Sequence, residues 1–137
     1  MWSWGRTSQA RLDTVNPILS EVLDLARDRG CPELTIPPYG GSRTLAEQRT
    51  LVGKGVSWNL DSKHRVDEPE IVVGRTKADA VDIAPWPIDW EDISRFQVVS
   101  GFILGAAMRL KVVIDWGGIW LPEKKKDWGH YELVISD

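Results

Sequence analysis

The sequence predicts an α+β fold, on three observations. Its 137 residues are about the length of one domain. Hydrophobic residues make up 42% of the chain and charged residues 27%, which is typical of a globular protein with one core. Helical and strand-like patterns alternate along the chain without the regular βαβ spacing that favours a parallel sheet. We therefore expect residues 1–137 to form one domain.

The first part of the chain predicts a broken helix and a short strand. Apolar residues recur at helical spacing over 8–29, and Gly30 follows as a stop. Asn16-Pro17 is expected to divide this helix, because proline disfavours helical geometry in the residue before it. Residues 34–36 indicate a short strand, and Gly40-Gly41 a turn after it.

A second helix and a long loop are expected next. Thr44 and Glu47 have the spacing of a capping box, so this helix begins there and is expected to end near Gly53 or Gly55. Residues 56–77 show no sustained periodicity of apolar residues, which predicts a long loop. The alternation of residues 78–84 indicates a strand.

The last part of the chain predicts a long helix and two strands. Apolar residues over 92–110 repeat at helical spacing, as in a helix packed on the core. Strands are expected over 111–114 and 131–135, on either side of a loop over 115–129. These elements complete the prediction of an α+β domain.

Charge and composition exclude several classes of protein. The formal net charge is −3, so the chain lacks the basic footprint of a nucleic-acid-binding protein. A single cysteine, Cys31, excludes an internal disulfide. Residues 1–13 contain no apolar signal segment, and the longest uncharged run, residues 96–108, is too short to span a membrane. We expect no membrane insertion, a monomer, and synthesis in the cytoplasm without a signal peptide.

Both histidines have acidic neighbours, which indicates a metal site. A catalytic zinc needs three protein ligands and an open position for water, and His64, Asp82 and His130 could supply the three. Asp127 lies three residues before His130, where it could act as the general base on that water. The same residues could instead be ordinary surface groups, since the chain has neither an HExxH motif nor a cysteine-based zinc pattern.

Several short motifs resemble those of the zinc DD-peptidase family. Ser62-x-His64 with Ala80-x-Asp82, and Asp127-x-x-His130, resemble its SxHxxGxAxD and (D/E)xxH signatures. Residues 41–48 resemble its GxRTxxEQ segment, and residues 116–120 resemble the WGGxW run of its phage members. The family includes D-Ala-D-Ala carboxypeptidases, dipeptidases, and the L-alanyl-D-glutamate endopeptidases that phages use as endolysins.

The resemblance implies both a fold and a set of roles. The fold would be a small antiparallel sheet with packed helices, the hedgehog/DD-peptidase-like domain, here without a separate cell-wall-binding domain. His64, Asp82 and His130 would bind Zn²⁺, and Asp127 would be the general base. Arg43 would stabilise the oxyanion or hold a substrate carboxylate, and Ser62 would orient the loop or the substrate.

Three departures from the family pattern bear on the site. Residues 65–81 separate the first histidine from the aspartate, which is 11 residues more than the family motif. We expect a loop to absorb them, because closure entropy grows slowly with length. Ala78 replaces the motif glycine, and Asp115 and Ile119 replace the Arg and Asp of many relatives.

Some residues have more than one interpretation. Glu132 could replace Asp127 as the base, and Arg43 could serve only to support the helix after it. Asp61 and Asp79 are expected to be solvated or turn-forming rather than ligands. Five tryptophans cluster near the motifs and could form the wall of a glycopeptide groove, with Trp120 and Trp128 as substrate-binding residues; the five are Trp86, Trp90, Trp116, Trp120 and Trp128.

The function that follows is a zinc metallopeptidase of bacterial cell walls. We expect it to hydrolyse an amide bond of peptidoglycan stem peptides, between L-Ala and D-Glu, as a phage or prophage endolysin that is released from the host cytoplasm. A D,D-carboxypeptidase or D-Ala-D-Ala dipeptidase is the alternative among enzymes. A non-catalytic zinc-containing module that binds the wall or a protein is the alternative outside them, although zinc binding alone needs neither Asp127 nor Arg43.

Overall fold

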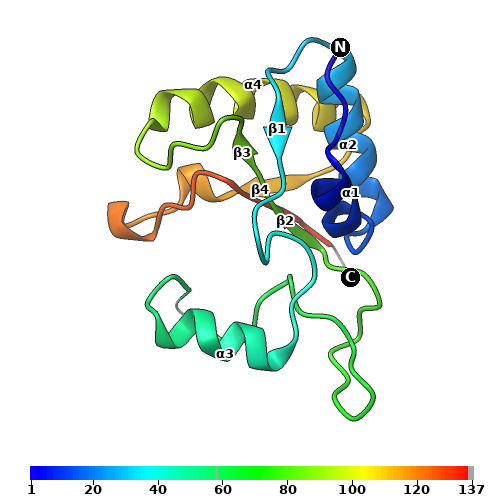
Figure 1. Ribbon diagram of the computed structural model, residues 1–137, viewed down its shortest axis with the longest axis vertical. Coiled ribbons are helices and arrows are strands. Elements are labelled where there is room, and N and C mark those ends of the chain that lie inside the picture. The colour runs from blue at the N-terminus through cyan, green and yellow to red at the C-terminus, as the bar shows by residue number, and fades with distance from the viewer. Residues whose placement is uncertain (58, 136–137) are drawn as a thin grey trace.

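The helices lie at opposite ends of the molecule, with the strands between them (Figure 1). The computed structural model describes residues 1–57 and 59–135. At one end lie three helices: α1 (Arg6–Leu12), α2 (Pro17–Asp28) and α4 (Ile93–Arg109). Helix α3 (Leu45–Gly53) and the long loop that follows it form the other end. This arrangement is the α+β fold that the sequence predicts.

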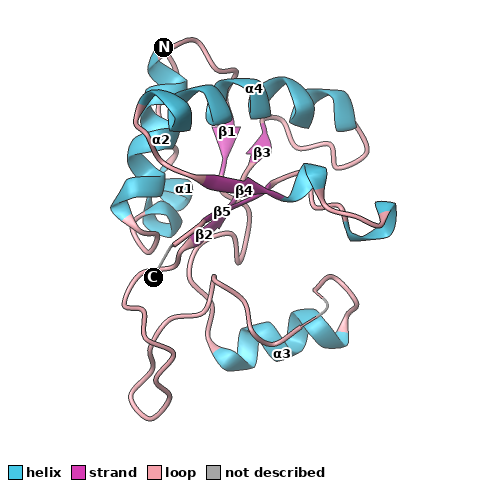
Figure 2. Ribbon diagram, turned by 180° about the vertical axis from the view of Figure 1, so that it is seen from behind, coloured by secondary structure: helices cyan, strands magenta, loops and turns pink. Residues whose placement is uncertain are grey.

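The strands form two small antiparallel sheets (Figure 2). In the first, β1 (Leu34–Thr35) pairs with β3 (Ala84–Pro85). In the second, β5 (His130–Leu133) lies between β2 (Ala80–Asp82) and β4 (Ile114–Trp116). Two short 3₁₀ helices, η1 (Gly117–Ile119) and η2 (Glu123–Lys125), connect β4 to the segment before β5.

The break between α1 and α2 lies where the sequence predicts it. Pro17 is the first residue of α2, and the Asn16 side chain caps the helix by accepting a hydrogen bond from the Ile18 N–H at 3.0 Å. The Asn16 amide also donates to the Asp79 carboxylate at 3.0 Å. One side chain therefore begins α2 and ties it to the segment that leads into β2.

One hydrophobic core joins the helical end to the sheet. Residues of α2, α4, β2 and β5 contribute side chains that are at most 5% exposed, among them Val22, Val81, Ile103 and Tyr131. Val81 and Tyr131 are directly paired between β2 and β5 and face this core. By strand alternation, their neighbours Asp82 and His130 point to the opposite face. None of the helices among the described residues has the length and apolar character to cross a bilayer.

The strand predicted over 78–84 is in fact two strands. Ile83 separates them: its N–H still donates to the Gly129 carbonyl, in register with the β2–β5 pairing, whereas from Ala84 onward the chain pairs with β1. The chain thereby passes from the three-stranded sheet to the two-stranded one. Gly129 lies so close to this crossing that a Cβ there would collide with the Ile83 carbonyl oxygen.

The strand predicted over 111–114 begins three residues later, at Ile114. Helix α4 ends in a Schellman motif, in which Lys111 N–H donates to Met108 and Val112 N–H donates to Ala107. Lys111 has the left-handed φ of 58° that this motif needs at a position where glycine is usual. The motif uses residues 111 and 112, so the extended segment starts after them. Strand β5 also starts one residue before the predicted range and ends at Leu133.

Helix α3 begins at the predicted capping box. The Thr44 side chain accepts from the Glu47 N–H at 3.1 Å, and the Glu47 carboxylate accepts from the Thr44 N–H at 2.9 Å. The buried residue of this helix is Gln48, so hydrogen bonds rather than an apolar face attach α3 to the rest of the molecule. The described part of 56–77 contains no helix or strand, as predicted.

Replacement of Asn16 by Ala is expected to lower the free energy of unfolding by about 1–2 kcal/mol, because it removes a helix cap and a hydrogen bond to Asp79. Chemical denaturation of the two proteins measures the difference. Gln9→Ala is the control, since it removes only an exposed hydrogen bond to Asp13. Equal midpoints for Asn16→Ala and the wild type would contradict the prediction.

Candidate metal centre and active site

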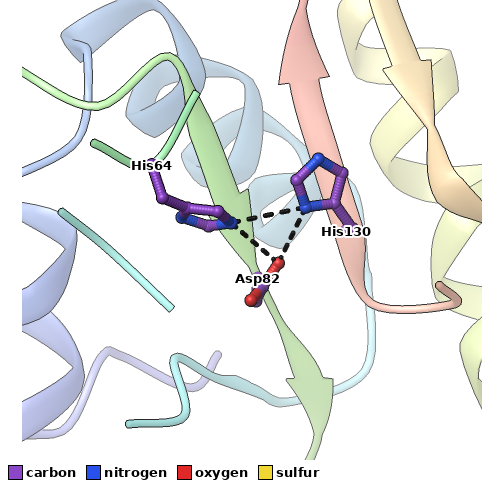
Figure 3. Close-up of side chains that lie close together, drawn as sticks. All are labelled: His64, Asp82 and His130. Carbon is purple, nitrogen blue, oxygen red and sulfur yellow. Dashed lines mark hydrogen bonds and ion pairs between the residues drawn. The ribbon is translucent and has the colours of Figure 1, made fainter. Parts of the chain in front are cut away.

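Three predicted ligands meet on one face of the three-stranded sheet (Figure 3). Asp82 ends β2 and His130 begins β5, and the two residues are directly paired across the strands. His64 comes from the loop that precedes β2. Its Nε2 lies 3.1 Å from Asp82 Oδ1 and 3.3 Å from His130 Nδ1, and the latter lies 3.0 Å from the same Asp82 oxygen. The structure thus brings all three residues together.

His64 is held by the turn that precedes α3. Its Nδ1 donates to the Gly41 carbonyl at 2.8 Å, which leaves Nε2 without that proton and facing Asp82. The ring is 1% exposed, and its burial lowers the pKa despite the nearby Asp82 carboxylate. Gly41 is packed so closely that a Cβ would meet the Arg11 carbonyl and the Thr14 hydroxyl. Glycine at this position therefore fixes the carbonyl that orients His64.

Asp82 is held by the guanidinium of Arg43. Oδ1 faces the two histidines, and Oδ2 accepts a hydrogen bond from Arg43 Nη2 at 2.8 Å. Arg43 donates also to Tyr39 O and to Gln48 Oε1, at 2.8 Å and 3.0 Å. Burial alone would raise the pKa of Asp82, but the charges and hydrogen bonds of the histidines outweigh it and hold the pKa far below its ordinary value.

His130 is held by Glu132, two residues along the same strand face. Its Nε2 donates to Glu132 Oε1 at 2.8 Å, and Lys63 Nζ lies 3.2 Å from Glu132 Oε2. Burial disfavours the protonated ring, but the hydrogen bonds to Asp82 and Glu132 outweigh it and raise the pKa of His130 to about 10. Burial also acts against ionised Glu132, yet its bonds to His130 and Lys63 lower its pKa. Glu132 is therefore an ionised partner of His130.

This donor set fits a metal ion. One nitrogen of each histidine and one Asp82 oxygen lie within 4.8 Å of one another. The other nitrogen of each ring donates to an oxygen, which is the outer-shell arrangement common for metal-binding histidines. Two imidazoles and one carboxylate suit several divalent transition metals and leave coordination positions open. The three residues could therefore hold a catalytic metal.

Asp127 lies beside the three ligands and lines the same cavity. Burial and the negative charge of Asp82 raise the pKa of its carboxyl to about 6, against the opposing charges of His130 and Arg43. Its N–H donates to the Gly117 carbonyl at 3.0 Å, and a Cβ on Gly117 would collide with the Asp127 backbone. The first glycine of the WGGxW run thus sets the position of Asp127.

A cavity of about 760 Å³ opens over the site, between the α3 end and the sheet. Its walls include Leu51 and Val56 on one side, and Trp90 and Trp120 on the other. Trp90 is 58% exposed and stacks on Phe96, with 5.7 Å between the ring centroids. A cavity of this volume, with apolar walls around a polar centre, is typical of a site for a small molecule or a peptide.

The other predicted site residues have different surroundings. Ser62 lines the cavity, and its hydroxyl accepts from the His64 N–H at 3.2 Å. Trp120 also lines it, and its ring centroid is 5.0 Å from that of His130. Asp115, a departure from the family pattern, accepts the Trp120 indole N–H at 2.9 Å. Trp128 is not among the described residues that line the cavity, and it packs against Trp116 instead.

Sequence reasoning did not identify the roles of Gln48 and Lys63, which hold Arg43 and Glu132 in place. Gln48 is fully buried and joins Arg43 to Ser57 and Asn59 by hydrogen bonds. Lys63 joins Glu132 to the Leu133 carbonyl. The match of Gln48 to the GxRTxxEQ segment was the one available signal for it. Asp79, predicted not to be a ligand, pairs with Arg75 and Asn16.

Comparisons with known proteins point to one family of peptidases. A family model described as phage L-alanyl-D-glutamate peptidase matches residues 1–134. The L-alanyl-D-glutamate peptidase of Escherichia phage T5 is 29% identical over 148 aligned positions, which cover 97% of this chain and 98% of that protein. The crystal structure of the L-Ala D-Glu endopeptidase ChiX of Serratia marcescens is similar with a TM-score of 0.75 and 26% identity, over 96% of this chain and 90% of that one.

Metal binding at pH 7 is expected to release about one proton per chain, because His130 is protonated in the metal-free site and its Nδ1 must lose that proton to become a ligand. Calorimetric titration in two buffers of different ionisation enthalpy measures the number released. Asp127→Asn keeps all three ligands and is expected to release the same number. If the heat of metal binding were the same in both buffers, no proton would be released. That result would show that His130 is not a ligand.

Proposed function

Because the chain belongs to the phage L-alanyl-D-glutamate peptidase family, we propose that it is an endolysin that hydrolyses the L-Ala–D-Glu amide bond of peptidoglycan stem peptides with a bound zinc ion. The observation that carries this proposal is the His64–Asp82–His130 cluster at the base of a cavity that also holds Asp127. The two named relatives are peptidases for this bond.

His64, Asp82 and His130 would hold the zinc. When bound, this ion would supply a Lewis acid that activates water and polarises the scissile carbonyl. The role of the protein is to keep the three ligand atoms in place. Gly41, Arg43 and Glu132 each fix one ligand by a hydrogen bond of 2.8 Å. This support favours a preorganised site over one assembled by the substrate.

Asp127 would be the general base. A pKa near 6 keeps its carboxylate ionised at neutral pH yet basic enough to accept the proton of the attacking water. The same carboxyl group would return the proton to the D-Glu nitrogen as the amide C–N bond breaks. Glu132 is the weaker candidate, because its two oxygens already face His130 and Lys63.

Arg43 would act first as a positioning residue. Its guanidinium donates to Tyr39, Gln48 and Asp82, so three of its donor directions are used within the protein. Its side chain still lines the cavity. We therefore propose that Arg43 orients the Asp82 carboxylate. A role of Arg43 in binding an oxyanion or a substrate carboxylate stays a prediction from the family resemblance.

We also propose that residues 1–137 act as a single peptidase domain. The enzyme would be made in the host cytoplasm and reach the wall when the host membrane is permeabilised. Trp120 and Ser62 would contact the stem peptide, since both line the cavity. Trp128 would contribute by packing against Trp116 rather than by contact with substrate.

Digestion of purified peptidoglycan with the zinc-loaded protein is expected to create new D-Glu amino termini, identified by mass spectrometry of the products. Asp127→Asn is expected to bind zinc normally but to lose activity by at least about 100-fold, because it removes the base and not a ligand. Free D-Ala in place of D-Glu termini would indicate the alternative carboxypeptidase or dipeptidase activity. Zinc binding without any product would favour the non-catalytic module.

The pH profile of kcat/KM is expected to fall on the acid side, with a limb at or below about pH 6. The base must be ionised to accept a proton from water. Activity is therefore lost as pH falls through the pKa of Asp127 and its carboxylate becomes protonated. The zinc content is measured at each pH, so that loss of metal is separated from protonation of the base. Constant activity down to pH 4 with zinc bound would exclude Asp127 as the base.

A further inference from the structure

The loop between His64 and Asp82 is a folded segment that reaches the cavity. Asp67 Oδ1 accepts the N–H groups of Val73, Gly74 and Arg75, at 2.8–3.3 Å. Glu68 and Ile71 exchange backbone hydrogen bonds of 2.8 and 3.1 Å, so the segment forms a tight hairpin. The Glu68 carboxylate accepts the Leu45 N–H at the start of α3. The inserted residues are thus fixed to the α3 end of the molecule.

This segment places Arg75 at the wall of the cavity. Arg75 Nη1 donates to the backbone carbonyls of Ser62 and Arg65 at 3.2 and 3.1 Å, and its side chain remains 20% exposed. The Ser62 carbonyl lies two residues before the ligand His64. Arg75 is therefore close to the site, and its Nη1 is held there by two neutral carbonyl groups.

Three arginine and lysine side chains line the cavity in the described part of the chain, and they have different partners. Arg43 Nη2 lies 2.8 Å from Asp82, and Lys63 Nζ lies 3.2 Å from Glu132. Both of these cations are engaged with carboxylates that face the ligand cluster. The carboxylate nearest to Arg75 is Asp79, at 3.5 Å, which is longer than a charge-assisted hydrogen bond and is shared with Asn16. Asp67 is a second carboxylate that interacts electrostatically with Arg75, but of the three side chains Arg75 has the longest ion-pair distance, so its charge is the least closely paired.

The proposed substrate carries a carboxylate that needs such a charge. In stem peptides D-Glu is linked onward through its side-chain carboxyl, so its α-carboxylate stands free, next to the scissile nitrogen. In the cavity this carboxylate would meet the like charges of Asp127 and Glu132. An arginine can compensate that repulsion, because its planar donors match a carboxylate. Resting on the proposed function, we propose that Arg75 binds the α-carboxylate of D-Glu and selects substrates in which it is not amidated.

A matched pair of synthetic muramoyl stem peptides tests this proposal. One peptide has the free D-Glu α-carboxylate, and the other has the α-carboxamide. For the zinc-loaded wild type, kcat/KM is expected to favour the acid by about tenfold or more. Arg75→Gln is expected to lose about that factor on the acid and to change the amide by less than about twofold. Arg75→Lys, which keeps the charge, is expected to retain part of the preference.

Arg49→Gln is the matched control, because Arg49 is an exposed arginine of α3 that does not line the cavity. It is expected to keep the wild-type ratio. An equal loss on both peptides in Arg75→Gln would show that Arg75 only supports the loop, and the proposal would be wrong. A wild type that cleaves both peptides equally well would also overturn it while leaving the proposed function intact. Cleavage of neither peptide would refute the proposed function as well.

Discussion

The candidate site depends on the register between β2 and β5. Antiparallel pairing puts Asp82 directly opposite His130, and Ala80 opposite Glu132, so the two ligands and the support for one of them share a face. On the other face, Val81 and Tyr131 are fully buried in the core. A shift of the β2–β5 pairing by one residue would bury Asp82 and His130 and expose the core residues. The hydrophobic core therefore fixes the geometry of the candidate metal ligands, although it contains none of them.

Local signals explain which parts of the fold could be predicted. Asn16-Pro17 and the capping box at Thr44 act within a few residues, so their positions follow from the sequence. One error arose where distant contacts decide the structure, and another where a residue takes a backbone conformation unusual for its type. The strand predicted over 78–84 divides at Ile83 because β2 pairs with β5 and β3 pairs with β1, and both partners are distant in the sequence. Lys111 takes the left-handed conformation that sequence rules expect of glycine, so nothing indicated that β4 would start late.

The candidate site could also be predicted only in part from the sequence. The ligands and Asp127 were predicted from spacing and from motifs, because their chemistry restricts the residue type. Their supports were not predicted, since a carbonyl such as that of Gly41 has no side-chain signature, and the Lys63–Glu132 pair joins residues 69 positions apart. Each candidate ligand is held by a different residue: His64 by Gly41, Asp82 by Arg43 and His130 by Glu132. Removal of any one support is thus expected to disturb one ligand before the others.

The separation of the ligands along the chain has a thermodynamic consequence. His64, Asp82 and His130 converge only when the loop and both strands are folded, so an unfolded chain does not present their combined site. Any ion that binds there adds to stability by mass action, by about 1.4 kcal/mol for each tenfold excess of free ion over its dissociation constant. The stability of this protein is then a property of its surroundings as well as of its sequence. With a metal ion bound at this site, stability would rise and fall with the free metal concentration of the compartment.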